Sequence, residues 1–172
     1  MLTTKQPRVS GQLALDAKTA ADLMTPNPIS FNDSITVHEA AAFFTEREIS
    51  AAPVIDVAGR PIGVLSRTDL VRYAQAPGKH VVPCKDFYEK AELGPPAKEP
   101  IAASFSIKPG DRTPITDIMT PTVLSVAPDT PALEVVAQLL AMKVHRLFVQ
   151  DAGGALVGVV SVFDVLRRLK KR

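Results

Sequence analysis

One segment of this chain occurs twice, and the duplication constrains the fold more than any other feature of the sequence. Residues 62–69 reappear as residues 157–164, an offset of 95 positions between residue 69 and residue 164. Each copy is an apolar run with a central glycine, then a serine and, three residues later, an aspartate. At the same offset, residues 22–26 match 117–121, and both contain Met-Thr-Pro. A match that keeps its phase over about 50 residues predicts a duplicated structural unit.

The pattern within each copy predicts the order β-α-β-β-α. Apolar runs of four to seven residues bounded by turn residues indicate strands, and apolar residues at helical spacing indicate the intervening helices. The predicted fold class is therefore α/β (α+β), with two such units packed as a pseudo-two-fold pair. In the first unit we expect strands at 29–31, 50–56 and 62–65 and helices at 36–47 and 69–74. In the second we expect strands at 123–126, 144–149 and 156–160 and helices at 131–142 and 165–169.

Helix start signals support this order. Thr36 and Glu39 fit the Ser/Thr-x-x-Glu capping box, and Thr130 followed by Pro131 suits a cap and a first helical position. A short helix is also expected within 18–24, ending before Pro26.

The predicted domain boundaries are an N-terminal arm at 1–17, a first repeat at 18–75, a Pro-rich insert at 76–113 and a second repeat at 114–172. The insert contains six prolines, and only residues 86–93 within it show a helical pattern. A loop of this length is either functional or disordered. We keep two interpretations: a surface excursion, or a lid or partner-docking element that uses Phe87, Tyr88 and Phe105.

Composition excludes several classes of protein. The chain has 172 residues and a formal net charge of +2, which is too small to argue for nucleic acid. Cys84 is the only cysteine, so an intrachain disulfide and a cysteine-based metal site are excluded. Residues 1–20 lack the pattern of a signal peptide, and no apolar run approaches the roughly 20 residues that span a bilayer. We therefore expect a cytoplasmic protein without a membrane segment.

Polar residues gather where each predicted hairpin begins and ends. Ser66 and Asp69, and likewise Ser161 and Asp164, stand where a strand passes into a helix, and His145 and Arg146 open a strand of the second unit. Strand ends are where α/β proteins bind ligands.

These motifs resemble a tandem pair of cystathionine-β-synthase (CBS) domains. Two Met-Thr-Pro segments and two Gly-apolar-apolar-Ser-x-x-Asp segments carry the resemblance, which covers about 115 residues. The segments 144–147 and 158–164 are most similar to the regulatory gamma subunit of AMP-activated protein kinase, and the chain also resembles bacterial stand-alone CBS-pair proteins. The resemblance implies a regulatory module, not an enzyme, that senses AMP, ADP or ATP between its repeats and has no catalytic cofactor.

The resemblance also implies composite ligand sites. It pairs Asp69 with His145 and Arg146, and Asp164 and Ser161 with Ile29 and Ala51. An ionised aspartate at a helix start accepts both ribose hydroxyls, while helix-start N–H groups with Ser66 or Ser161, and His145 with Arg146, serve phosphate. Ile29 and Val123 are expected to form an apolar slot for adenine. The remaining candidate ligand-binding residues are Arg67, Thr68 and Phe163. Ser50 and Ala51 replace the His-Arg pair in the first repeat, which weakens the case for phosphate in the Asp164 site.

Other interpretations stay open at this point. Asp69 and Asp164 have an alternative interpretation as helix N-caps, the two serines as junction residues, and Arg146 as a solvated side chain. An enzyme is disfavoured because no phosphate-binding loop or nucleophile–base pair is visible. A nucleic-acid binder would rest on the basic residues at 167–172, which a solvated helix end explains more simply. The main alternative function is a structural dimerisation module without a ligand.

We also expect a homodimer, because Leu70, Val71, Leu166 and Leu169 would otherwise stay exposed on helix faces. An unidentified regulated protein is a further expected partner.

Overall fold

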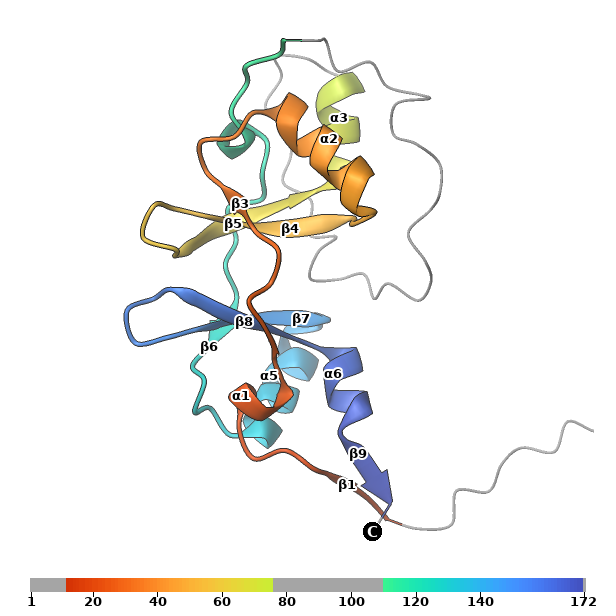
Figure 1. The fold of residues 1–172 in the computed structure, drawn as a ribbon. Helices are drawn as coiled ribbons and strands as arrows, with labels where there is room; N and C mark the ends of the chain where they lie inside the picture. Colours follow the sequence, from red (N-terminus) through yellow and green to blue (C-terminus); the bar gives the residue numbers. More distant parts are fainter. Residues whose placement is uncertain (1–11, 76–109, 172) are drawn as a thin grey trace, which may run out of the picture.

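The computed structural model describes residues 12–75 and 110–171, and it contains the two expected β-α-β-β-α units (Figure 1). Repeat 1 consists of β3 (Phe31–Asn32), α2 (Val37–Arg47), β4 (Ala51–Ile55), β5 (Pro61–Ser66) and α3 (Arg67–Gln75). Repeat 2 consists of β6 (Ser125–Val126), α5 (Ala132–Met142), β7 (Arg146–Gln150), β8 (Leu156–Ser161) and α6 (Val162–Arg167). The predicted mixed fold class is confirmed.

The two sheets are built in the same way. In each repeat the first strand pairs in parallel with the first strand of the hairpin, as in Phe31 with Val54 and Val126 with Val149. The hairpin strands pair antiparallel, and both ladders shift register near the same place, at Val54/Ile55 and Val149/Gln150. Even the irregularities therefore follow the repeat.

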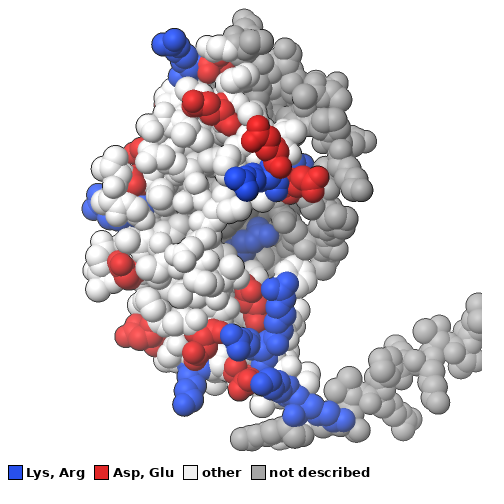
Figure 2. Space-filling model, viewed as in Figure 1, with Lys and Arg blue, Asp and Glu red and all other residues white. Residues whose placement is uncertain are grey.

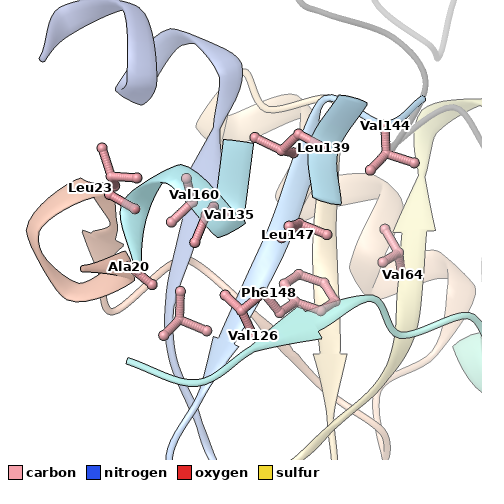
Figure 3. Close-up of a cluster of buried hydrophobic side chains, with 12 residues drawn as sticks. Ala20, Leu23, Val64, Val126, Val135, Leu139, Val144, Leu147, Phe148 and Val160 are labelled. Carbon is pink, nitrogen blue, oxygen red and sulfur yellow. The ribbon is translucent and has the colours of Figure 1, made fainter. Parts of the chain in front are cut away.

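The helices cover the outer face of each sheet, so the inner faces of the two sheets are turned toward each other (Figure 1). One hydrophobic cluster joins α2 to the sheet of repeat 1 through Val37, Ala40 and Phe44. A second joins α5 to the sheet of repeat 2 and includes Val64 of repeat 1, near Phe148 (Figure 3). A residue of repeat 1 is thus part of the core of repeat 2.

Helix starts were predicted in part. The Thr36 capping box is confirmed, because the Thr36 backbone N–H donates to Glu39 at 2.8 Å and the Glu39 N–H donates to the Thr36 hydroxyl at 3.3 Å. Thr130 is not the cap of α5. Pro131 takes that position, and the Thr130 hydroxyl instead accepts from the Ala127 N–H at 3.1 Å, because it closes the preceding turn.

Each Met-Thr-Pro segment pairs with the opposite repeat. The expected helix before Pro26 is α1 (Ala20–Leu23), and β2 (Thr25–Pro26) then pairs with β8 of repeat 2. A 3₁₀ turn, η2 (Ile115–Asp117), precedes Thr120, which forms a bridge to Val64 of repeat 1. The segments thereby exchange places between the two sheets.

This exchange explains the glycine inside each repeated motif. A Cβ at Gly63 would lie 2.7 Å from the Thr120 carbonyl oxygen and 2.8 Å from the Met119 sulfur. A Cβ at Gly158 would overlap the Met24 side chain, with Cγ at 2.9 Å. Since real side chains do not tolerate such distances, glycine is needed at both crossing points.

The two chain ends pair with each other. In the N-terminal arm, β1 (Leu13–Leu15) pairs antiparallel with β9 (Leu169–Lys171). The basic C-terminal run, expected as a helix end, is one only at Arg167 and Arg168, because Lys170 and Lys171 lie in β9. The helix stops at Arg167, because the chain that follows is drawn into a ribbon in which Lys170 pairs with Asp16 at 2.5 Å. That contact lowers the pKa of the Asp16 carboxyl.

The expected helix at 86–93 and the aromatic residues of the insert lie outside the described residues. Where the chain becomes described again, Asp111 and Thr113 each hydrogen-bond the Tyr73 hydroxyl at 2.8 Å, which ties α3 to the start of repeat 2. The Thr113 contact lowers the pKa of Tyr73, but desolvation and the Asp111 carboxylate raise that pKa, and the net change is upward. Within the described ranges, no helix has the length and apolar character to cross a membrane.

The crossing points give a test of the swapped arrangement. We expect Gly63→Ala and Gly158→Ala each to lower the free energy of unfolding by about 1–3 kcal/mol, as overpacking does. Urea unfolding measures the change.

The atoms in contact make the two variants respond differently to a second change. Adding Met24→Ala to Gly158→Ala should recover much of the loss, because the three nearest atoms all belong to the Met24 side chain and the change removes the two nearest of them. Adding Met119→Ala to Gly63→Ala should not, because the Thr120 carbonyl remains. Equal recovery in both double-mutant cycles would contradict this packing.

Candidate functional site

A capping box fixes the polar residues where β5 of repeat 1 passes into α3. The Asp69 Oδ2 atom accepts from the Ser66 backbone N–H at 2.8 Å and from the Ser66 hydroxyl at 2.6 Å. In return, the Asp69 N–H donates to the Ser66 hydroxyl at 3.3 Å. Both side chains are buried, with exposed fractions of 4% for Ser66 and 1% for Asp69.

Repeat 2 builds the same junction between β8 and α6. Asp164 Oδ2 accepts from the Ser161 N–H at 2.8 Å and from its hydroxyl at 2.5 Å, and the Asp164 N–H donates to Ser161 at 3.3 Å. The other carboxylate oxygen, Oδ1, accepts from the Thr25 hydroxyl at 3.4 Å. It also lies 3.8 Å from Arg167. A residue of repeat 1 therefore completes the surroundings of Asp164.

These contacts correct two expectations about the helix starts. The serine, not the aspartate, caps the helix, and the aspartate is the third helical residue of the box. The serine hydroxyls donate to the aspartates, so their hydrogens are not available to a phosphate in this structure. The first helical N–H groups are also used, because Arg67 donates to the Ser50 carbonyl at 2.8 Å and Val162 donates to the His145 carbonyl at 3.0 Å. Side-chain cations are therefore the first candidates to hold a phosphate.

The candidate cations lie at the same edge of the molecule as the aspartates. Arg146 is the first residue of β7 and stands opposite Ser161 in the antiparallel ladder, just as Ala51 stands opposite Ser66. His145 precedes Arg146 and is half-buried. The Arg67 guanidinium donates to the Phe44 carbonyl at 3.2 Å, so it helps to hold α2 against α3.

Alternation along the strands indicates which way Arg146 faces. Ala52 and Val54 of β4 point into the core of repeat 1, so Ala51 lies on the other face, where it packs against the cluster of repeat 2. Arg146 holds the matching position in β7 and is therefore expected on the face turned to repeat 1. Figure 2 shows the surface hollowed where the two halves meet, with a Lys or Arg side chain recessed there.

The remaining candidates lie at varied depths. Ile29 follows β2 and is 49% exposed. Val123 is half-buried and packs against the core of repeat 2, so only part of it is open to a ligand. Thr68 and Phe163, which are matching residues in the first turns of α3 and α6, are both half-buried.

Two threonines that the sequence analysis did not assign to the site belong beside it. Thr25 contacts Asp164, and Thr120, 2% exposed, forms a bridge with Val64 of β5, the strand that leads to Asp69. Among the described residues, the buried polar or charged side chains are Ser66, Asp69 and Thr120. The sequence signal for both threonines was the repeated Met-Thr-Pro, which indicates the duplication but does not show that the threonines lie beside the aspartates.

The fold and the two matched junctions agree with the family comparison. The model of the CBS domain matches residues 20–76 and again residues 115–171. The chain belongs to the CBS-domain family and carries two copies of the domain in tandem.

The chain is also similar in sequence to two curated proteins. The chain is 29% identical over 161 residues to the chloroplastic CBS domain-containing protein CBSX2 of Arabidopsis thaliana, covering 87% of this chain and 62% of that protein. It is 29% identical over 146 residues to the gamma-3 subunit of 5'-AMP-activated protein kinase of Bos taurus, covering 81% of this chain and 25% of the subunit. The chain thus spans less than two thirds of the length of either relative.

Solved structures share the fold. A crystal structure of CBSX2 in complex with AMP has a TM-score of 0.59 and 26% identity, covering 88% of this chain and 95% of that one. The cytosolic domain of the Mg²⁺ channel MgtE in complex with ATP has a TM-score of 0.59 and 28% identity, covering 89% and 49%.

The capping boxes have a structural role that can be measured apart from ligand binding. We expect Ser161→Ala to lower the free energy of unfolding by about 1 kcal/mol, as loss of a serine cap does, and Ser161→Thr to preserve it. Ser125→Ala, at an exposed position in β6, serves as the control. If Ser161→Ala unfolds in urea at the same midpoint as Ser125→Ala, the box does not stabilise α6.

Proposed function

We propose that this chain is a non-catalytic regulatory module that binds adenine nucleotides between its two CBS repeats. The observation that carries the proposal is the composite junction, in which Thr25 of repeat 1 contacts Asp164 of repeat 2. A ligand at such a junction touches both repeats, so its binding can change how they sit together. The AMP complex of CBSX2 and the ATP complex of the MgtE domain support this choice of ligand.

Ribose is the part of the ligand that suits the aspartates. Its two adjacent hydroxyls donate, and a carboxylate near a helix start accepts while it complements the helix dipole. The capping box uses Oδ2 of both Asp69 and Asp164, so the ribose contact falls to Oδ1. Ile29 and Val123 supply apolar surface for adenine, and Thr68 and Phe163 stand in the first helical turns beside the ribose.

Phosphate distinguishes the two sites. With the serine hydroxyls and first N–H groups already engaged, His145 and Arg146 are the residues proposed to hold phosphate, on a nucleotide whose ribose is bound by Asp69. Ser50 and Ala51 occupy the matching positions for the Asp164 site and carry no charge. We therefore assign phosphorylated ligands to the Asp69 site.

We further propose that the module is not an enzyme and that it acts on an unidentified regulated protein as a homodimer. Three of the four residues expected on exposed helix faces are not there, since Leu70 is fully buried in the core of repeat 1, Val71 is half-buried, and Leu169 is half-buried in β9. Leu166 is 53% exposed and still supports the proposed dimer as an apolar side chain that a second copy could cover. A cytoplasmic location stays a prediction from the sequence.

Ligand binding should raise the stability of the fold. At a nucleotide concentration 100 times the dissociation constant, the expected gain is roughly 2.7 kcal/mol. Thermal unfolding with AMP, ADP and ATP measures it. If millimolar concentrations of all three leave the melting temperature unchanged, the module is structural and does not sense nucleotides.

The assignment of the phosphate site can be tested by isothermal titration. We expect Arg146→Ala to weaken binding of ATP and AMP about tenfold or more, because a hydrogen bond to a charged group contributes about 1.5–3 kcal/mol, and to leave adenosine binding nearly unchanged. Asp69→Ala should weaken all three ligands, because it removes the ribose contact.

Two further variants serve as controls. Lys143→Ala removes the same charge from an exposed position near Arg146 and should bind ATP like the wild type. Wild-type ATP affinity in Arg146→Ala, or a larger loss in Asp164→Ala than in Asp69→Ala, would show that the site has been assigned to the wrong repeat.

A further inference from the structure

The hairpin turns of the two repeats touch each other, at the edge of the molecule opposite the starts of α3 and α6 (Figure 1). The Leu156 N–H of repeat 2 donates to the Gly59 carbonyl of repeat 1 at 2.9 Å. A Cβ on Gly59 would lie 3.9 Å from the Cβ of Ala155, which is ordinary van der Waals contact. The two repeats are therefore joined directly at their turns.

Side-chain hydrogen bonds fix the shape of both turns. In repeat 1, the Asp56 Oδ1 atom accepts from the backbone N–H groups of Ala58 and Arg60, each at 2.9 Å. Asp151 makes the same pair of bonds at the same distance in the turn of repeat 2. An aspartate that accepts from the N–H group two residues further on forms an Asx turn, which stabilises a tight turn locally.

One side chain reaches from the turn of repeat 1 to the turn of repeat 2. The Arg60 Cδ atom would lie 3.5 Å from a Cβ on Gly154, so the stem of Arg60 lies against that glycine. Asp56 holds the guanidinium in place, because its Oδ2 atom is 2.8 Å from both Nε and Nη2. At the offset of 95 residues, Ala155 matches Arg60. Repeat 2 forms the same turn with alanine, so the arginine is needed for the contact between the turns and not for the turn itself.

The other links between the two sheets leave more freedom. Strand β2 pairs with β8 of repeat 2, and residues 28–30 then lead to the sheet of repeat 1. Thr120 forms a bridge with Val64 of repeat 1, and residues 121–123 lead to the sheet of repeat 2. Val64 also packs near Phe148, but apolar packing is not directional (Figure 3). These links permit one sheet to rock against the other while the turns stay together.

The edge that holds Asp69 and Arg146, which we call the ligand edge, lies at the far end of the same hairpins. Strand β5 runs from Pro61 to Ser66, and its six residues at about 3.3 Å each span about 20 Å. We infer that the joined turns, with Arg60 across them, are a hinge, and that a nucleotide draws the two repeats together at the ligand edge. The inference rests on the nucleotide binding proposed above. A rotation too small to part the turns moves the ligand edge much further, because that edge lies far from the hinge.

A disulfide across the turns tests whether they stay joined. The 3.9 Å between the Cβ positions of residues 59 and 155 suits a disulfide, whose Cβ atoms lie about 3.8 Å apart. In a Cys84→Ser background, Gly59→Cys with Ala155→Cys should form this bond on mild oxidation. The oxidised and reduced forms should then bind AMP with the same affinity, because the turns stay in contact throughout. A weaker affinity in the oxidised form, or a folded variant that forms no disulfide, would overturn the hinge.

Distances between spin labels test where the repeats move. Val57 and Ala152 are matched, exposed residues of the two turns, and Glu46 and Ala141 are matched, exposed residues at the ends of α2 and α5 that lead to the ligand edge. Labelled chains, with cysteine at one pair or the other, are diluted in excess unlabelled chain so that only pairs within one copy are measured. Saturating AMP should shorten the 46–141 distance and leave the 57–152 distance unchanged. An equal change at both pairs, or no change at either with AMP bound, would contradict the hinge.

Two variants test the part played by Arg60. Arg60→Ala removes the stem that lies against Gly154 and should broaden the distribution of 57–152 distances, whereas Arg60→Met keeps an apolar stem and should not. A distribution in Arg60→Ala like that of the wild type would show that the arginine does not join the turns. Titration that finds no AMP binding would overturn the proposed function and the role of the hinge in it. A folded variant without the disulfide would overturn the hinge alone.

Discussion

The exchange of the two Met-Thr-Pro segments between the sheets is the contact on which the rest of the structure depends. Each segment leaves its own repeat and pairs with the hairpin of the other, at Gly158 and at Gly63. One repeat alone would leave this edge of its sheet and the inner face of its hairpin without a partner. The exchange joins two small sheets into one folded unit and brings Thr25 to Asp164 across the junction.

The capping boxes connect that architecture to ligand chemistry. Each aspartate accepts hydrogen bonds at its helix start through Oδ2, and Oδ1 of Asp164 also accepts from Thr25 across the junction, so the fold holds the groups proposed to bind ribose. The two junctions are not equal, however. Asp69 is 1% exposed, while the Asp164 side chain is 11% exposed and has Arg167 nearby. The backbones of the two repeats match closely, but the burial of the aspartate differs. The residue that opens the hairpin also differs, since repeat 2 has Arg146 where repeat 1 has Ala51.

Much of the fold was predictable from the sequence, because each strand and helix pattern occurs in two copies and each copy supports the assignment of the other. The hairpins, the Thr36 capping box and the order of elements follow from local patterns. The pairing of Leu13–Leu15 with Leu169–Lys171 was missed because it joins the two chain ends, which no local pattern reports. The burial of Leu70 was missed because helical spacing gives a face but does not say what covers it. At the site, the serines and aspartates were found from the repeat. Their mutual hydrogen bonds, and the approach of Thr25, depend on the exchange between repeats.

A nucleotide bound as proposed touches both repeats at once. Hydrogen exchange measured by mass spectrometry, with and without saturating AMP, tests it most directly. We expect slower exchange in two separate stretches, the first turn of α3 that contains Asp69 and the start of β7 that contains Arg146. Protection of only one of these stretches, or of neither while AMP is bound, would contradict a ligand held between the repeats.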